Sequence, residues 1–140
     1  MREIDASTTV DLAAARAGYP MVFPQGLDDG YRPTSARTDA GAADPGDPVT
    51  LEIGYVTPSE EFAEFVVSDD RRAEPLAKLL DGAEQHGTVE VGGRPWTRST
   101  TTAGETVLVV QESDAIVAVS CSPSEQELET VAAAVRPYPG

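Results

Sequence analysis

The chain has 140 residues, which fits one domain with a core large enough to fold without disulfides or a structural metal. Its 24 acidic residues outnumber its 10 basic ones and give a formal net charge of −14, which repels phosphate backbones and disfavours nucleic acid as a partner. No stretch reaches the roughly 18 consecutive apolar residues of a membrane span, and a single cysteine cannot form an internal disulfide.

The first half of the chain predicts a short helix, a loop and about three strands. An alanine-rich run follows three candidate capping residues and ends at a glycine, which predicts a helix over 7–18. After an extended stretch at 31–39, the Gly, Pro and Asp residues of 40–48 predict a flexible loop. Apolar and polar residues then alternate over 49–57, as in a half-buried strand, and 61–68 follows after a turn as its hairpin partner.

The second half contains two more predicted helices. Leucines at helical spacing indicate a helix over 73–87, with Gly87 as its end. The last predicted helix covers 122–137, where Ser122 and Glu125 form a candidate capping box and a stripe of apolar residues follows.

Two hairpins lie between these helices. The Gly-Gly pair at 92–93 fits a type I′ turn, because both central residues of that turn have positive φ, and this register places Val89 opposite Trp96. The second hairpin places Val110 opposite Val117. Its strands are apolar on both faces, which predicts a central position in the sheet with helices as cover.

This order of elements predicts the α+β class. Strands joined by short turns pair antiparallel, and helices that do not alternate one by one with strands disfavour a wound parallel sheet. We therefore expect one domain over 1–140, built as a single antiparallel sheet of six or seven strands flanked by about three helices.

The segment "PQGLDDGYRPTSAR" at 24–37 raises the question of whether it is a functional loop or a structural clamp. Its proline lacks a backbone donor, its two glycines permit positive φ, and its paired aspartates can accept hydrogen bonds from nearby amides, which is the chemistry of a tight loop. A turn needs no leucine. We therefore expect Leu27 and Tyr31 to fold back over an open end of the sheet, as a clamp between the first helix and the core.

This segment, followed by "IGYVTP", "VGGRPWTR" and "SEQELETVAAAVRP" in the same order, resembles a family of uncharacterised actinobacterial envelope proteins, a domain of unknown function. The resemblance covers nearly the whole chain, although Tyr31 and Leu51 stand where tryptophan is common in the family. The residues that carry it as a structural family motif are Pro24, Gly26, Leu27, Gly30, Tyr31, Gly54, Gly93, Arg94, Trp96, Glu127 and Leu128.

The resemblance implies a location as well as a fold. Family members typically begin with one transmembrane helix just before the region matched here, so the expected domain faces outside the cytoplasm, on the cell membrane. The natural gene is then expected to encode an apolar anchor upstream of Met1, and contact with the membrane would occur only through that anchor. The family has no activity to transfer.

The candidate chemistry is sparse. His86 is the sole histidine and is expected at a helix end, and Cys121 lies in an apolar run that predicts a buried, inert thiol. The acids Asp39, Asp44 and Asp47 lack the spacing of a calcium-binding EF-hand. We expect no catalytic residues, no cofactor and no metal.

Two functions remain open at this point. The first is a noncatalytic envelope domain that binds a partner protein or an apolar or polymeric envelope ligand. The second is a carboxylate-dependent hydrolase without a recognisable motif, since paired acids are abundant. Convergent carboxylates with raised pKa values in a pocket favour the hydrolase, whereas an apolar groove or patch favours binding.

Overall fold

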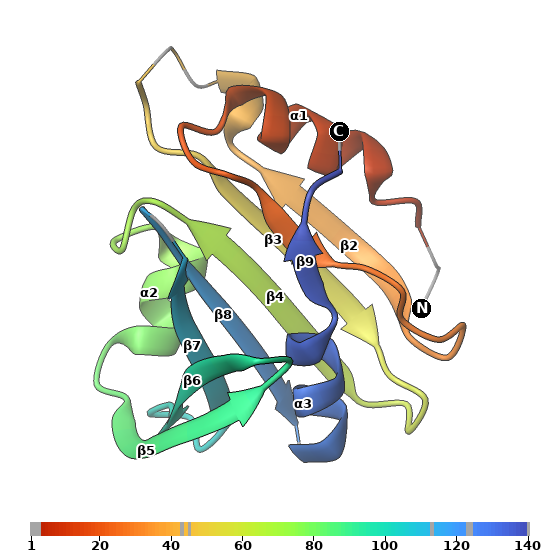
Figure 1. Ribbon diagram of the computed structural model, residues 1–140, viewed down its shortest axis with the longest axis vertical. Helices are drawn as coiled ribbons and strands as arrows, with labels where there is room; N and C mark the ends of the chain where they lie inside the picture. Colours follow the sequence, from red (N-terminus) through yellow and green to blue (C-terminus); the bar gives the residue numbers. More distant parts are fainter. Residues whose placement is uncertain (1–3, 43, 45, 113, 123–124, 140) are drawn as a thin grey trace.

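The computed structural model describes residues 4–42, 44, 46–112, 114–122 and 125–139. A seven-stranded antiparallel sheet forms the body of the molecule (Figure 1). In spatial order its strands are β2 (Arg32–Thr38), β3 (Thr50–Val56), β4 (Phe62–Ser68), β8 (Ala115–Ser122), β7 (Thr106–Glu112), β6 (Arg94–Thr100) and β5 (Glu84–Val91).

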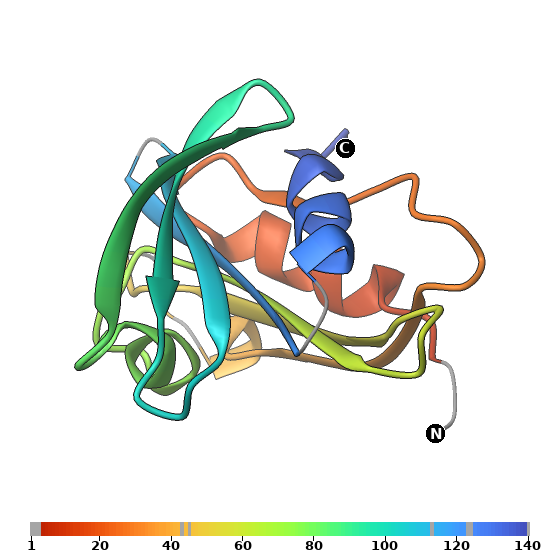
Figure 2. The same ribbon diagram turned by 90° about the horizontal axis from the view of Figure 1, so that it is seen from below.

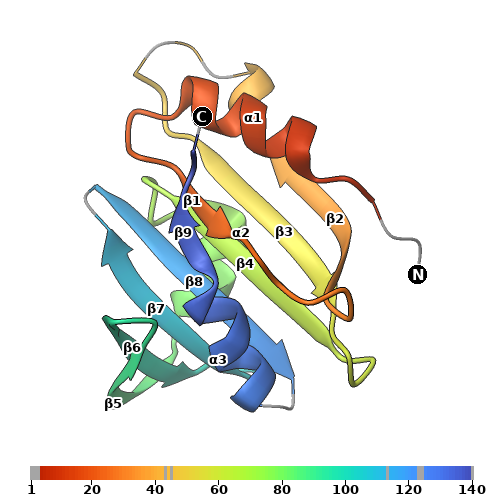
Figure 3. The same cartoon turned by 45° about the vertical axis from the view of Figure 1, so that its right-hand side comes forward.

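A second sheet of two short strands contradicts the expected fold class. Strands β1 (Val22–Pro24) and β9 (Val135–Pro137) pair antiparallel, side by side in Figure 3, and join the early part of the chain to its late part. The described part of the chain is thus mostly β, with nine strands in two sheets, and the prediction of a single sheet in an α+β domain was wrong. Three-residue strands are too short to show an alternating pattern, so this pair could not be recognised from local sequence.

Three short helices cover the large sheet: α1 (Ser7–Arg16), α2 (Glu74–Leu80) and α3 (Glu125–Ala133). Helices α1 and α3 share one side with the β1–β9 pair, and α2 lies on the other side (Figure 2). The central strands bury both faces: Phe65 and Val67 of β4 contact the main core, and Val66 between them packs with Leu76 and Leu79 of α2. This cover confirms the central position expected for β8.

Both predicted hairpin registers are confirmed. Val89 lies opposite Trp96, and Val110 lies opposite Val117. The turn at 92–93 has φ of 60° at its first glycine and 81° at its second, as a type I′ turn requires.

Two helix ends were predicted wrongly. Helix α2 stops at Leu80, and residues 84–91 form an edge strand, so His86 lies on β5 with its Nε2 2.8 Å from the Thr100 hydroxyl. Gly82, with φ of 70°, ends the helix about two turns earlier than expected, because left-handed backbone cannot continue it. The last helix ends at Ala133 because 135–137 pairs with β1.

Some expectations fall where the structure gives no answer. Residues 123–124 lie outside the described residues, as do the side chains of Cys121 and Ser122, so the buried thiol and the capping box stay predictions. Part of the loop predicted at 40–48 is a short 3₁₀ helix, Ala40–Ala42, and positions 43 and 45 also lie outside the described residues.

Candidate functional site

A pocket of about 290 Å³ opens between the N-terminal half of α1, strand β1, the loop that follows β1, and strands β2 and β3 of the large sheet. Most of the side chains around it are apolar or aromatic. Its lining consists of Asp5, Ala6, Ser7, Val10, Asp11, Phe23, Pro24, Leu27, Tyr31, Pro33, Ile53, Tyr55 and Tyr138. The volume is near the lower limit of small-molecule sites, which span about 300–1,000 Å³.

The loop after β1 is held against the pocket from the side of β9. The Gln25 backbone N–H donates to the Ala134 carbonyl at 2.9 Å, and its side-chain amide donates to the carbonyls of Arg136 (2.9 Å) and Pro137 (3.0 Å). These bonds fix the loop so that the half-buried Leu27 packs against the core. The leucine thus closes one wall of the pocket.

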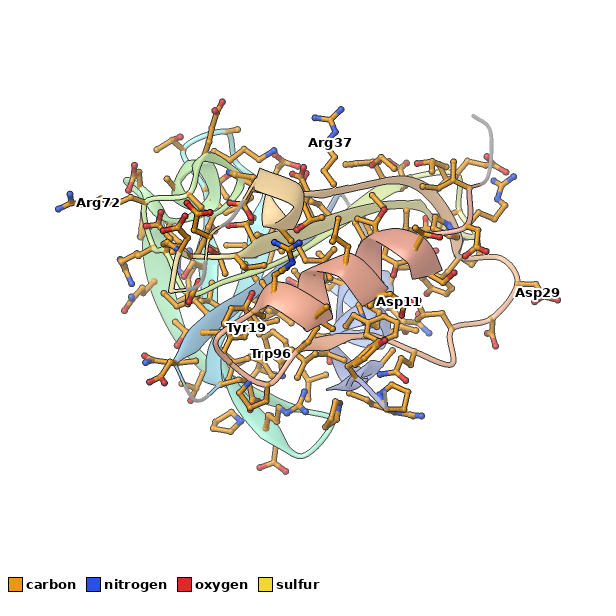
Figure 4. The ribbon with its side chains drawn as sticks, turned by 90° about the horizontal axis from the view of Figure 1, so that it is seen from above. Asp11, Tyr19, Asp29, Arg37, Arg72 and Trp96 are labelled. Atoms are coloured by element: carbon orange, nitrogen blue, oxygen red, sulfur yellow. The ribbon has the colours of Figure 1, made fainter. Side chains whose placement is uncertain are left out.

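The acidic tip of the same loop takes no part in the wall. Asp28 and Asp29 are exposed, and Asp29 projects away from the molecule (Figure 4). The Asp28 carbonyl accepts a hydrogen bond from the Tyr31 amide at 2.9 Å, which closes a turn. The contrast between a packed leucine and solvated aspartates agrees with the clamp expected from the sequence.

Tyr138 forms the rim of the pocket opposite the loop. Its hydroxyl donates to Asp11 Oδ1 on α1 at 2.6 Å, and its ring lies against Phe23 with centroids 6.1 Å apart. The hydrogen bond to Asp11 raises the pKa of Tyr138, because the carboxylate stabilises the protonated phenol. Asp5, also at the mouth, accepts from the Ser7 amide at 2.9 Å, and this bond lowers its pKa.

Tyr55 lies on the sheet side of the pocket and is 6% exposed. Burial raises its pKa, so the phenol keeps its proton. Among the described residues, no group forms a hydrogen bond with its hydroxyl. Tyr19, which is buried to the same degree, instead donates to the Val49 carbonyl at 2.7 Å.

Carboxylates converge at one place, on the opposite face of the sheet. Lys78 of α2 lies 3.3 Å from Glu64 and 3.8 Å from Glu52. Desolvation raises the pKa of Glu64, which is 8% exposed, while the ammonium of Lys78 opposes this shift. Glu64 Oε1 lies 3.3 Å from the Lys78 ammonium, but it receives no hydrogen bond from the described residues.

A larger hollow of about 460 Å³ adjoins this carboxylate pair. Glu52 and Lys78 line it, and Glu64 does not. Asp39 also lines this hollow, and its carboxylate accepts a hydrogen bond from the Thr50 amide at 2.8 Å. Within the described part of the chain, no group of three or more His, Cys, Asp and Glu side chains is placed to hold a metal ion.

The structure separates the residues of the sequence motif into several places. Pro24, Leu27 and Tyr31 meet at the apolar pocket. Three others lie on the β5–β6 hairpin, where Trp96 is completely buried and has no surface to offer a ligand. The other two on this hairpin are Gly93 and Arg94, and the remaining five members lie in the loop after β1, in β3 or on α3: Gly26, Gly30, Gly54, Glu127 and Leu128.

Most of the pocket wall could not be recognised from the sequence. The alternation over 49–57 placed Ile53 and Tyr55 on one face of a strand, which was a usable signal for the sheet side. Nothing marked Tyr138, because its position depends on β9, nor Asp11, which lies inside the helix expected over 7–18. These residues meet only through tertiary packing.

The fold and the site define a mostly-β domain with a small apolar pocket. In the described residues, no helix is long and apolar enough to cross a bilayer. The chain belongs to the family described as "Protein of unknown function (DUF4245)", whose model matches residues 1–135. This match confirms that a domain of unknown function spans nearly the whole chain. No curated protein matches it.

Proposed function

We propose that the chain is a noncatalytic binding domain that takes an apolar group, from a small ligand or from a partner, into the pocket beside α1. The observation that carries the proposal is the lining itself: aromatic and aliphatic side chains such as Phe23, Ile53 and Tyr55 surround a preformed space of about 290 Å³. Apolar walls with a few polar groups at the mouth are typical of sites that bury a ligand by the hydrophobic effect.

The location proposed for this domain is the outer side of the cell membrane, in an actinobacterial envelope. The resemblance noted in the sequence supports it, because members of that family are anchored by one helix. On this proposal residues 1–140 act as one domain that reaches its ligand in the envelope.

A carboxylate-dependent hydrolase is the second candidate. The raised pKa of Glu64 and its position near Glu52 favour it, since a protonated acid beside an ionised one can serve general acid–base chemistry. However, Glu64 does not line the adjacent hollow, and Lys78 forms ion pairs with both carboxylates. Binding is therefore the better-supported function.

Benzene titration followed by ¹H–¹⁵N NMR tests the binding function. We expect saturable shifts at the amides of Leu27, Tyr31 and Ile53, because an apolar cavity binds an apolar solute of this size. Leu27→Trp should abolish these shifts by filling the pocket, and Leu12→Trp, at a 38% exposed position on α1, is the matched control. Absence of shifts in the wild type would refute the proposal.

The hydrolase candidate is tested on the same protein. Purified protein is assayed against nitrophenyl esters and glycosides together with the variant Glu52→Gln/Glu64→Gln. Hydrolysis by the wild type that the double variant lacks would favour the enzyme, and equal rates for both proteins would exclude these carboxylates as its catalytic groups. For the location, protease added to intact cells should degrade the domain if it faces outward.

A further inference from the structure

We infer that the pocket binds an uncharged acyl group, of about the length of an octanoyl ester, whose carbonyl oxygen accepts a hydrogen bond from the Tyr55 hydroxyl. This inference rests on the proposed binding function and adds the chemical class of the ligand. Size, hydrogen bonding and charge each support it separately.

The size of the pocket limits the ligand to a short chain. A volume of about 290 Å³ holds about ten groups the size of a water molecule, at roughly 30 Å³ each. Methyl octanoate has nine carbons and two oxygens, so its number of non-hydrogen atoms is close to this number of groups. Longer chains would have to leave the pocket through its mouth.

The Tyr55 hydroxyl supplies the polar specificity. Buried polar groups in proteins nearly always have a hydrogen-bond partner, and an unsatisfied one costs stability. In this protein the Tyr19 hydroxyl donates to a backbone carbonyl at 2.7 Å. The Tyr55 hydroxyl has no hydrogen-bond partner among the described residues, and it is not one of the fully buried atoms that lack a partner, so it is open to solvent beside the pocket. Because the phenol stays protonated, it can donate to a carbonyl oxygen of the ligand.

Charge disfavours a free fatty acid. The described lining includes no Lys, Arg or His to pair with a carboxylate, and its two ionisable acids, Asp5 and Asp11, stand at the mouth. Both already accept hydrogen bonds, from the Ser7 amide and the Tyr138 hydroxyl. A carboxylate would enter a negative mouth without a counter-ion, so an ester or amide is the favoured form.

Stability measurements on the unliganded protein test the state of the Tyr55 hydroxyl. Tyr55→Phe should leave the urea midpoint unchanged, because the hydroxyl forms no hydrogen bond with the described residues that the substitution could remove. The matched control Tyr19→Phe should lower the midpoint, because its hydroxyl is bonded to Val49. A fall in the midpoint of Tyr55→Phe equal to that of Tyr19→Phe would show that the Tyr55 hydroxyl is already satisfied and would overturn the inference.

Binding measurements test the ligand class. In NMR titrations with methyl octanoate, Tyr55→Phe should weaken binding about threefold to tenfold, which corresponds to one neutral hydrogen bond. Octanoate at neutral pH should bind at least about tenfold more weakly than the ester, because its charge loses solvation without a partner. Equal binding of ester and acid, or no effect of Tyr55→Phe, would overturn the inference, and retained benzene binding would then leave the binding function standing.

Two further probes distinguish the sources of the acyl group. Dihexanoyl phosphatidylcholine presents it as a lipid ester, and an octanoylated peptide presents it as an amide. Tighter binding of one identifies the source and supports the inference. Binding of neither, with benzene still bound, overturns it, whereas loss of benzene binding as well refutes the proposed function itself.

Discussion

Truncation of Leu27 to alanine tests whether the loop after β1 is a clamp. The substitution removes three carbon atoms from a half-buried side chain that packs against the main core. At about 0.8 kcal/mol per buried methylene, full burial would cost about 2.4 kcal/mol. The residual exposure reduces this value, and the vacated space joins an open pocket, so little cavity cost is added. We expect a loss of about 1.5–2 kcal/mol in the free energy of unfolding.

The assay is urea unfolding followed by the fluorescence of Trp96, the only tryptophan, which is completely buried. The control Leu12→Ala changes an exposed leucine of α1 and should alter stability by less than about 0.5 kcal/mol. The double variant Asp28→Asn/Asp29→Asn should be similarly neutral, since both side chains are exposed. If the aspartates matter and Leu27 does not, the loop is a polar site and the clamp is wrong.

Three further predictions concern the sheet and its cover. Burial raises the pKa of the Glu64 carboxyl above its ordinary value of 4.5. The contribution of this carboxyl to stability is therefore fully present below about pH 4.5 and is lost as the pH rises through the raised pKa. In urea titrations, the stability of the wild type relative to Glu64→Gln should fall as the pH rises. Gly54→Ala should cost about 1–3 kcal/mol in the same assay, because its Cβ would lie 2.5 Å from Ser35 Oγ, whereas Gly18→Ala, with no atom within 4 Å, should be neutral. Arg94→Lys should lower the free energy of unfolding by about 1 kcal/mol. Lysine cannot replace both the hydrogen bond to the Val135 carbonyl on β9 and the ion pair with Glu112 on β7, each 2.8 Å long. Equal stability of the variant and the wild type would show that these bonds contribute nothing.

Local features made the hairpins predictable. The Gly-Gly pair at 92–93 determines the turn type, and the turn type determines which residues of the two strands face each other. The apolar character of β8 on both faces likewise predicted its place in the middle of the sheet. In these elements the neighbouring residues alone decide the structure.

The remaining errors come from contacts between distant residues. Residues 84–87 continue a helical pattern, yet they belong to β5, where Glu84 and Gln85 pair with β6, because strand pairing and Gly82 override a weak helix propensity. The β1–β9 pair depends on residues more than a hundred positions apart, and no local pattern marks either strand. The apolar pocket follows from that pair, so its far rim at Tyr138 could not be predicted.

The β1–β9 pair also determines when the pocket comes into existence during synthesis. Gln25 and Arg136, which hold the two strands together, are 111 positions apart. At about 5–20 residues per second on the ribosome, about 6–22 seconds pass between the appearance of β1 and that of its partner. Throughout this interval the segment around Phe23 has no strand to pair with, and its apolar side chains are open to chaperones. A nascent chain can therefore form its hairpins early, but it acquires a binding site only after nearly all of it has been made.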